Sequence, residues 1–136
     1  MSDVKAKVLV VDDQKDIVET VSFCLKQEGY QVFTAGDGEE ALGVARAQKP
    51  DVLILDVMLP KENGYQVARF LHEDHIGGKL AKQPQILMLT ARVVEDPERQ
   101  AFIESWTGTN HFMYKPFDLD ELVRKVSELS EVALQP

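Results

Sequence analysis

Short, mostly apolar runs alternate with longer amphipathic segments along this sequence, and the alternation occurs five times. The apolar runs are rich in Val, Ile and Leu, as expected of strands that are covered on both faces. The amphipathic segments repeat apolar residues at three- and four-residue spacing, which indicates helices with one buried side. Repeated strand–helix units predict an α/β fold, with helices on both faces of a parallel sheet and right-handed crossovers. The predicted strands cover residues 7–11, 31–35, 52–55, 86–89 and 111–114.

Helix-capping signals delimit the segments between these strands. Three of the segments begin at an aspartate, which is followed by a glutamate three residues later in two cases and directly by a proline in the third. Gly29 ends the first predicted helix. Residues 75–84 contain two adjacent glycines and are predicted to form a loop. The predicted helices cover residues 14–28, 64–74 and 97–106, and two more start at the caps 37 and 118.

Composition and charge exclude several classes of protein. The chain has 136 residues, of which 44% are hydrophobic and 28% charged, and this balance fits one globular domain over residues 1–136. The formal net charge of −8 argues against direct binding of nucleic acid. No apolar run approaches the roughly 18 residues that a membrane span needs, and the N-terminus lacks an apolar export segment. The single cysteine, Cys24, excludes an internal disulfide framework, so we expect a cytoplasmic protein.

Polar residues directly follow four of the predicted strands. Asp12 and Asp13 follow the first strand, Asp56 the third, Thr90 the fourth and Lys115 the fifth. In an open parallel sheet, ligands bind in the crevice beyond the carboxyl ends of the strands. We therefore expect these five side chains to converge on one small site.

The residue types at this edge match the requirements of phosphoryl transfer. Three clustered carboxylates repel one another, and a hard cation such as Mg²⁺ offsets that repulsion. Asp56 can act as a carboxylate nucleophile that forms an acyl phosphate. The transferred group needs its equatorial oxygens neutralised. Mg²⁺ can contact one oxygen, Lys115 a second, and the Thr90 hydroxyl with a backbone amide a third.

Four motifs in order resemble the receiver domain of bacterial response regulators, over residues 5–131. The resemblance implies a flavodoxin-like sheet of order 2-1-3-4-5, in a protein that takes part in a two-component phosphorelay. It implies a phosphoacceptor switch rather than an enzyme, whose only chemistry is its own phosphorylation and dephosphorylation. The motifs are Val8–Asp13, Leu55–Pro60 with Gly64, Met88–Ala91 and Lys115–Phe117.

The resemblance also assigns roles to individual residues. Asp56 accepts the phosphoryl group from a sensor histidine kinase or phosphotransfer protein. Asp12 and Asp13 hold Mg²⁺ together with Asp56, and the backbone carbonyl of Met58 completes the protein ligands. Lys115 contacts the phosphoryl group, and its peptide bond to the following proline is expected to be cis. A downstream protein partner is expected to bind the face formed by the fourth helix, fifth strand and fifth helix.

Two positions of that face depart from the family pattern. Phe112, three residues before Lys115, stands at the position of the aromatic switch residue that acts with Thr90, and it lacks a hydroxyl. It fits a core role as well as a switch role. Trp106, beside the unusual turn at 107–110, fits a core role as well as a contact with a partner. These departures concern the partner surface and leave the phosphorylation site intact.

Three rival functions remain to be weighed. A phosphorylation-independent pseudo-receiver, acting as a protein-binding adaptor, normally lacks part of the acidic or lysine set, and none is missing here. An enzyme of the haloacid-dehalogenase type needs a second aspartate two positions after the nucleophile, where this chain has Met58. A nucleotide- or flavin-binding protein needs a glycine-rich turn where Asp12 and Asp13 stand. The sequence leaves open the cognate kinase, the output and the oligomeric state, a homodimer included.

Overall fold

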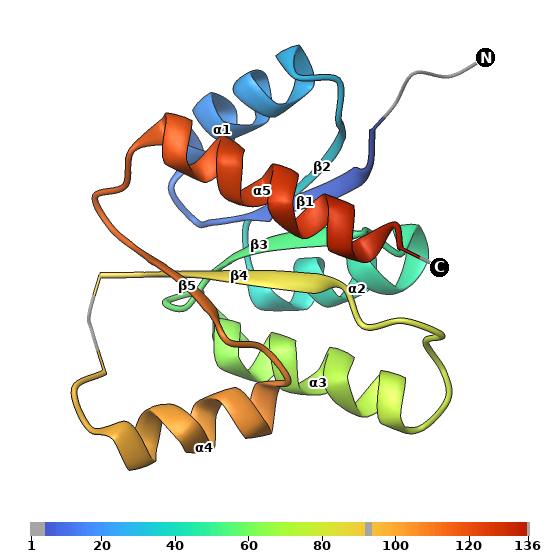
Figure 1. Cartoon of the computed structure of the whole chain (residues 1–136), viewed down its shortest axis with the longest axis vertical. Helices are drawn as coiled ribbons and strands as arrows, with labels where there is room; N and C mark the ends of the chain where they lie inside the picture. Colours follow the sequence, from blue (N-terminus) through green and yellow to red (C-terminus); the bar gives the residue numbers. More distant parts are fainter. Residues whose placement is uncertain (1–4, 92–93, 136) are drawn as a thin grey trace.

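A parallel sheet of five strands forms the centre of the molecule, in the order β2-β1-β3-β4-β5 (Figure 1). The computed structural model describes residues 5–91 and 94–135. Its strand order confirms the predicted flavodoxin-like α/β fold. Predictions that concern residues 1–4 or 92–93 lie outside the described part. The strands are β1 (Lys7–Val11), β2 (Gln31–Ala35), β3 (Val52–Asp56), β4 (Gln85–Thr90) and β5 (His111–Tyr114).

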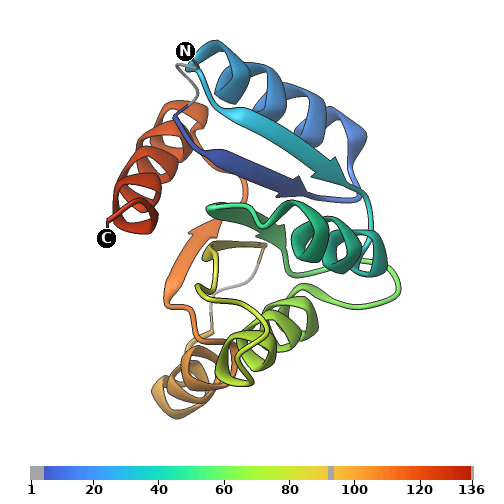
Figure 2. The same cartoon turned by 90° about the vertical axis from the view of Figure 1, so that its right-hand side faces the viewer.

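Five helices cover the two faces of the sheet in the described part of the chain (Figures 1 and 2). The helices α1 and α5 lie on one face, and α2, α3 and α4 lie on the other. No helix in the described ranges has the length and apolar character to cross a membrane. The helices are α1 (Lys15–Gln27), α2 (Gly38–Gln48), α3 (Gly64–Ile76), α4 (Pro97–Thr107) and α5 (Leu119–Ala133).

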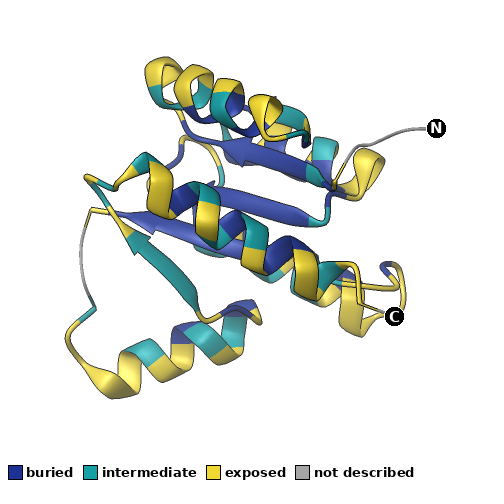
Figure 3. Cartoon of the chain, turned by 45° about the horizontal axis from the view of Figure 1, so that its top comes forward, coloured by how far each residue is buried: buried dark blue, intermediate teal, exposed yellow. Residues whose placement is uncertain are grey.

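The alternation of side chains along the central strands divides the core into two layers. Leu9, Leu53 and Met88 pack with the apolar residues of α2 and α3. Their neighbours in the chain, such as Val10 and Ile54, pack with those of α1 and α5. Figure 3 shows these central strands buried, whereas β5 at the edge is only partly covered. Burial on both faces explains why the central strands are continuous apolar runs.

The helix boundaries confirm most of the capping signals. Asp37, Asp96 and Asp118 each accept a hydrogen bond from a backbone N–H of their helix. The helix α3 continues to Ile76, two residues beyond the predicted end, so the following loop is shorter than predicted. A capping box at the start of α3, between Asn63 and Gln66, was not predicted.

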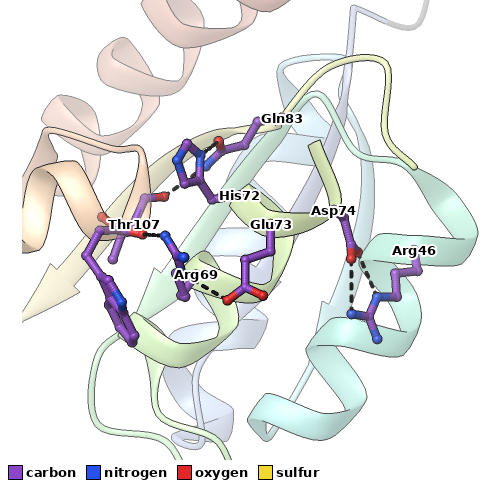
Figure 4. A network of polar contacts seen from close by, with 8 residues as sticks. Arg46, Arg69, His72, Glu73, Asp74, Gln83 and Thr107 are labelled. Atoms are coloured by element: carbon purple, nitrogen blue, oxygen red, sulfur yellow. Dashed lines mark hydrogen bonds and ion pairs between the residues drawn. The ribbon is translucent and has the colours of Figure 1, made fainter. Parts of the chain in front are cut away.

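Polar side chains of α3 connect this helix to its neighbours (Figure 4). Asp74 pairs with Arg46 of α2 at 2.9 Å. Arg69 donates to the carbonyl of Trp106 at 3.1 Å, and its guanidinium lies over the indole ring. His72 contacts Gln83, which donates to the carbonyl of Thr107 at 2.9 Å. We call these contacts the α3 network. Trp106 is therefore half-buried against α3. Its burial is intermediate between that of a core residue and that of an exposed contact for a partner, the two roles that the sequence left open.

Candidate functional site

The sheet brings together the five polar residues that follow its strands. Asp56 pairs with Leu89 across β3 and β4, and Thr90 pairs with Tyr114 across β4 and β5. The backbone N–H of Lys115 donates to the carbonyl of Thr90 at 2.9 Å, which links the end of β5 to the end of β4. The carboxyl ends of the strands therefore place five residues at one edge, as the sequence predicts. They are Asp12, Asp13, Asp56, Thr90 and Lys115.

Three carboxylates form the centre of this edge. One oxygen atom from each of Asp12, Asp13 and Asp56 lies within 4.8 Å of the others. Asp12 and Asp56 are buried, whereas Asp13 is exposed. The backbone N–H of Gln14 donates to Oδ1 of Asp12 at 2.9 Å, and that of Met58 donates to Oδ1 of Asp56 at 3.3 Å. These hydrogen bonds orient the two buried carboxylates.

Lys115 supplies the positive charge of the site. Its Nζ lies 2.9 Å from Oδ2 of Asp12 and 3.5 Å from Oδ2 of Asp56. Burial acts to lower the pKa of Lys115, but the hydrogen bond to Asp12 and the charges of both carboxylates outweigh burial and raise this pKa. Burial and the charge of Asp12 raise the pKa of Asp56, although Lys115 opposes the shift. The site therefore carries more negative charge than one lysine neutralises.

Comparison with known proteins identifies the family. A family model of the response regulator receiver domain matches residues 8–127. The chain belongs to the response regulator receiver family. It is 40% identical over 130 residues to the alkaline phosphatase synthesis transcriptional regulatory protein PhoP of Bacillus subtilis. It is 41% identical over 123 residues to the probable transcriptional regulatory protein TcrX of Mycobacterium tuberculosis.

The similarity covers nearly all of this chain but only part of those relatives. The two alignments span 93% and 90% of this chain, and 50% and 48% of the relatives. The chain thus spans about half the length of these curated relatives. A solved structure of the chemotaxis response regulator CheY4 of Vibrio cholerae aligns with a TM-score of 0.76 at 33% identity, over 91% of this chain and 98% of that one. The predicted fold and the two-component family are confirmed.

The carboxylates of this receiver domain fit a divalent cation. Receiver domains typically bind Mg²⁺ at a cluster of aspartates, and the cluster here offers three carboxylates within 4.8 Å. When all three are ionised, one ammonium group leaves two negative charges unbalanced. Mg²⁺ binds oxygen ligands, carboxylates among them, and its two positive charges would offset this excess. Burial is the main cause of the raised pKa of Asp56, and the charge of Asp12 raises this pKa further.

Thr90 and Phe112, the expected switch residues of the receiver domain, lie on neighbouring strands. Thr90 is buried at the end of β4. Phe112 is half-buried and packs against the core layer that faces α2 and α3. Phe112 therefore makes core contacts in this conformation, and its switch role stays a prediction. The peptide bond between Lys115 and Pro116 is cis, as the resemblance implied.

Two features of the site were missed by the sequence analysis. The ion pair between Lys115 and Asp12 joins residues 103 positions apart, and no local pattern indicates which carboxylate a lysine will contact. The second feature is the support of the loop after β3 by Gly38 of α2. The sequence indicates only a helix cap at Asp37 and no role for the glycine that follows it. A glycine in the first helical turn, where its flexibility is not needed, is the signal that a close backbone contact exists there.

Proposed function

We propose that this receiver domain accepts a phosphoryl group on Asp56 and signals by a change of conformation. The observation that carries the proposal is the position of the buried Asp56 carboxylate. It lies within 4.8 Å of the carboxylates of Asp12 and Asp13, and 3.5 Å from Nζ of Lys115. The donor is a phosphohistidine of a sensor histidine kinase or phosphotransfer protein.

The transfer replaces one bond to phosphorus by another. A carboxylate oxygen of Asp56 attacks the phosphorus, and the P–N bond of the phosphohistidine breaks. The electron pair of that bond goes to the imidazole nitrogen, which takes up a proton. When bound by Asp12, Asp13, Asp56 and the carbonyl of Met58, Mg²⁺ supplies charge neutralisation at one phosphoryl oxygen. Lys115 is placed to contact a second oxygen, because its ammonium already lies beside Asp56.

The conformational response involves Thr90 and Phe112. The Thr90 hydroxyl binds a phosphoryl oxygen and draws the end of β4 toward Asp56. Phe112, on the adjacent strand, adjusts its packing to that movement. The altered surface is the face of α4, β5 and α5, where a downstream protein binds. Phosphorylation shifts the equilibrium only by its differential affinity for the two conformations.

The wider assignments follow from the same proposal. Residues 5–131 form the receiver core, and the domain works in the cytoplasm, where its kinase partner acts. Association into a homodimer would use the same altered face. A pseudo-receiver that binds partners without phosphate is the competing function, and the complete set of Asp12, Asp13, Asp56 and Lys115 favours the phosphorylated switch.

Direct phosphorylation tests the proposal. Incubation with acetyl phosphate and Mg²⁺ should add the mass of one phosphoryl group to the intact protein. Asp56→Asn should abolish this addition, and so should an excess of chelator in the wild-type reaction. Labelling that persists in Asp56→Asn would place the acceptor elsewhere. A wild-type protein that is never labelled, by acetyl phosphate or by a kinase, would favour the pseudo-receiver.

A further inference from the structure

The loop of residues 57–63, which we call the β3–α3 loop, is fixed at both ends. The backbone N–H of Val57 donates to the carbonyl of Leu89 at 2.9 Å. The N–H of Gly64 donates back to the carbonyl of Val57 at 2.8 Å. Leu59 is buried in the core between these ends. Met58, whose carbonyl is the expected ligand for Mg²⁺, is one of the exposed residues of this stretch.

A third support comes from the first turn of α2. Gly38 is buried there, and its N–H donates to the carbonyl of Pro60 at 3.2 Å. A Cβ atom at Gly38 would overlap the backbone carbonyl of Glu62. Two of the three nearest atoms belong to the backbone of Glu62 and the third is its Cβ, which is bonded directly to that backbone, so side-chain rotation cannot move them aside. By contrast, a Cβ at Gly36 or Gly43 would meet no atom within 4 Å.

Charged side chains also connect the β3–α3 loop to the start of α2. Nζ of Lys61 lies 3.6 Å from Asp37 and 3.5 Å from Glu39, both at the start of α2. Lys61 has a φ of 68°, in the left-handed region that residues other than glycine rarely adopt. These ion pairs are exposed and contribute little free energy. They do show that the strained part of the loop is turned toward α2.

We propose that Gly38 is a positioning residue for the metal site, because its missing side chain lets the β3–α3 loop rest on α2. This inference rests on the proposed Mg²⁺ site. The core residues of α2, such as Ala41 and Leu42, are buried and hold the helix in place, so a side chain at Gly38 would displace the loop instead. Mg²⁺ demands near-ideal octahedral geometry, and a displaced Met58 carbonyl would leave one ligand misplaced.

The experiment compares two glycine-to-alanine variants of one helix. Gly38→Ala should weaken Mg²⁺ binding, measured by titration calorimetry with MgCl₂, by about tenfold, as is typical when a residue behind a ligand is changed. Phosphorylation by acetyl phosphate should fall at low Mg²⁺ and recover at saturating Mg²⁺, which a general loss of structure would not allow. Gly43→Ala is the matched control and should bind Mg²⁺ like the wild type.

A measurement on the wild-type protein covers the case in which Gly38→Ala fails to fold. If the contact at Gly38 favours Mg²⁺ binding, Mg²⁺ must strengthen that contact by the same factor. Hydrogen exchange at the Gly38 amide should therefore slow when MgCl₂ is added, while exchange at the Lys49 amide, at the far end of α2, should not change. Equal Mg²⁺ affinity in folded Gly38→Ala, or unaltered exchange at Gly38, would overturn the inference. A wild-type protein that does not bind Mg²⁺ would overturn the proposed site and this role with it.

Discussion

Asp12 and Asp74 are both almost fully buried, yet their surroundings differ. Asp74, in the α3 network, has the guanidinium of Arg46 at 2.9 Å, and no second carboxylate of residues 5–91 and 94–135 shares that contact (Figure 4). Asp12 shares the ammonium of Lys115 with Asp56, and Asp13 adds a third carboxylate nearby. One cluster is balanced, and the other keeps an excess of negative charge.

This difference separates a structural cluster from a binding site. A balanced pair has satisfied its charges inside the protein, so a further ion brings it nothing. The unbalanced cluster costs the fold free energy, and a cation recovers that cost on binding. Both clusters contain buried aspartates and basic side chains, so residue types alone do not distinguish them. The two clusters are distinguished by the number of carboxylates that share each basic side chain.

The largest expected effect comes from removing the ammonium of Lys115, which pairs with Asp12 and Asp56 in the acidic site. Lys115→Met should lower the free energy of unfolding by about 3 kcal/mol without Mg²⁺, because the buried Asp12 loses its partner. The same variant should be stabilised more by MgCl₂ than the wild type, since lysine no longer competes with the ion for the carboxylates. Urea denaturation with and without MgCl₂ measures both quantities.

Arg46→Met provides the control for that experiment. It also removes a cation from a buried aspartate, Asp74, but in the balanced cluster. The stabilisation by MgCl₂ should equal that of the wild type. If Mg²⁺ stabilises Lys115→Met and Arg46→Met to the same extent, the charge balance does not decide which cluster binds a cation.

The contrast between the two clusters also limits what the sequence can predict. The convergence of Asp12, Asp56 and Lys115 follows from strand ends alone, because a parallel sheet brings its carboxyl ends to one edge. The α3 network has no such rule. Arg69 and Gln83 reach carbonyls at the end of α4 that lie 37 and 24 positions away. Such contacts depend on how two helices pack side by side, and the periodicity of apolar residues does not predict that packing.

The same reason explains Gly38 and the partners of Lys115. The capping signals at Asp37 and Asp118 are local, so they could be predicted and were confirmed. The contact of Gly38 with the β3–α3 loop joins the first turn of α2 to the loop before α3, and its only trace in the sequence is a glycine. Local signals thus predict the helices, the strands and the edge of the sheet that carries the site. The contacts that hold the site in place, such as those of Gly38 and Lys115, can be seen only in the packed structure.

A smaller effect is expected from the protonation of Asp56. Its pKa in the folded protein is raised above the ordinary value of 3.8 by burial and by the charge of Asp12. The folded state therefore binds the proton more tightly than the unfolded state. The stability that this provides is fully present below pH 3.8 and is lost as the pH rises through the raised pKa.

Asp56→Asn tests this pH dependence without Mg²⁺. The variant should be more stable than the wild type by on the order of 1 kcal/mol at neutral pH, since it buries no charge. The difference should shrink as the pH falls toward 3.8. Thermal denaturation of both proteins across this range measures it. A difference that stays constant with pH would show that the Asp56 carboxylate is not destabilised by its neighbours.

The smallest effect belongs to the balanced cluster. Gln83→Ala removes the bond to the Thr107 carbonyl and the contact with His72, and should lower the free energy of unfolding by about 0.5 kcal/mol. Trp106, the single tryptophan of the chain, lies under Arg69 in this network, so its fluorescence reports the unfolding of the region directly. The affinity for Mg²⁺ and the labelling of Asp56 should match the wild type, because the network shares no charge with the acidic site. A change in Mg²⁺ affinity in Gln83→Ala would show that the two clusters are coupled through α3, and that the separation drawn between them is wrong.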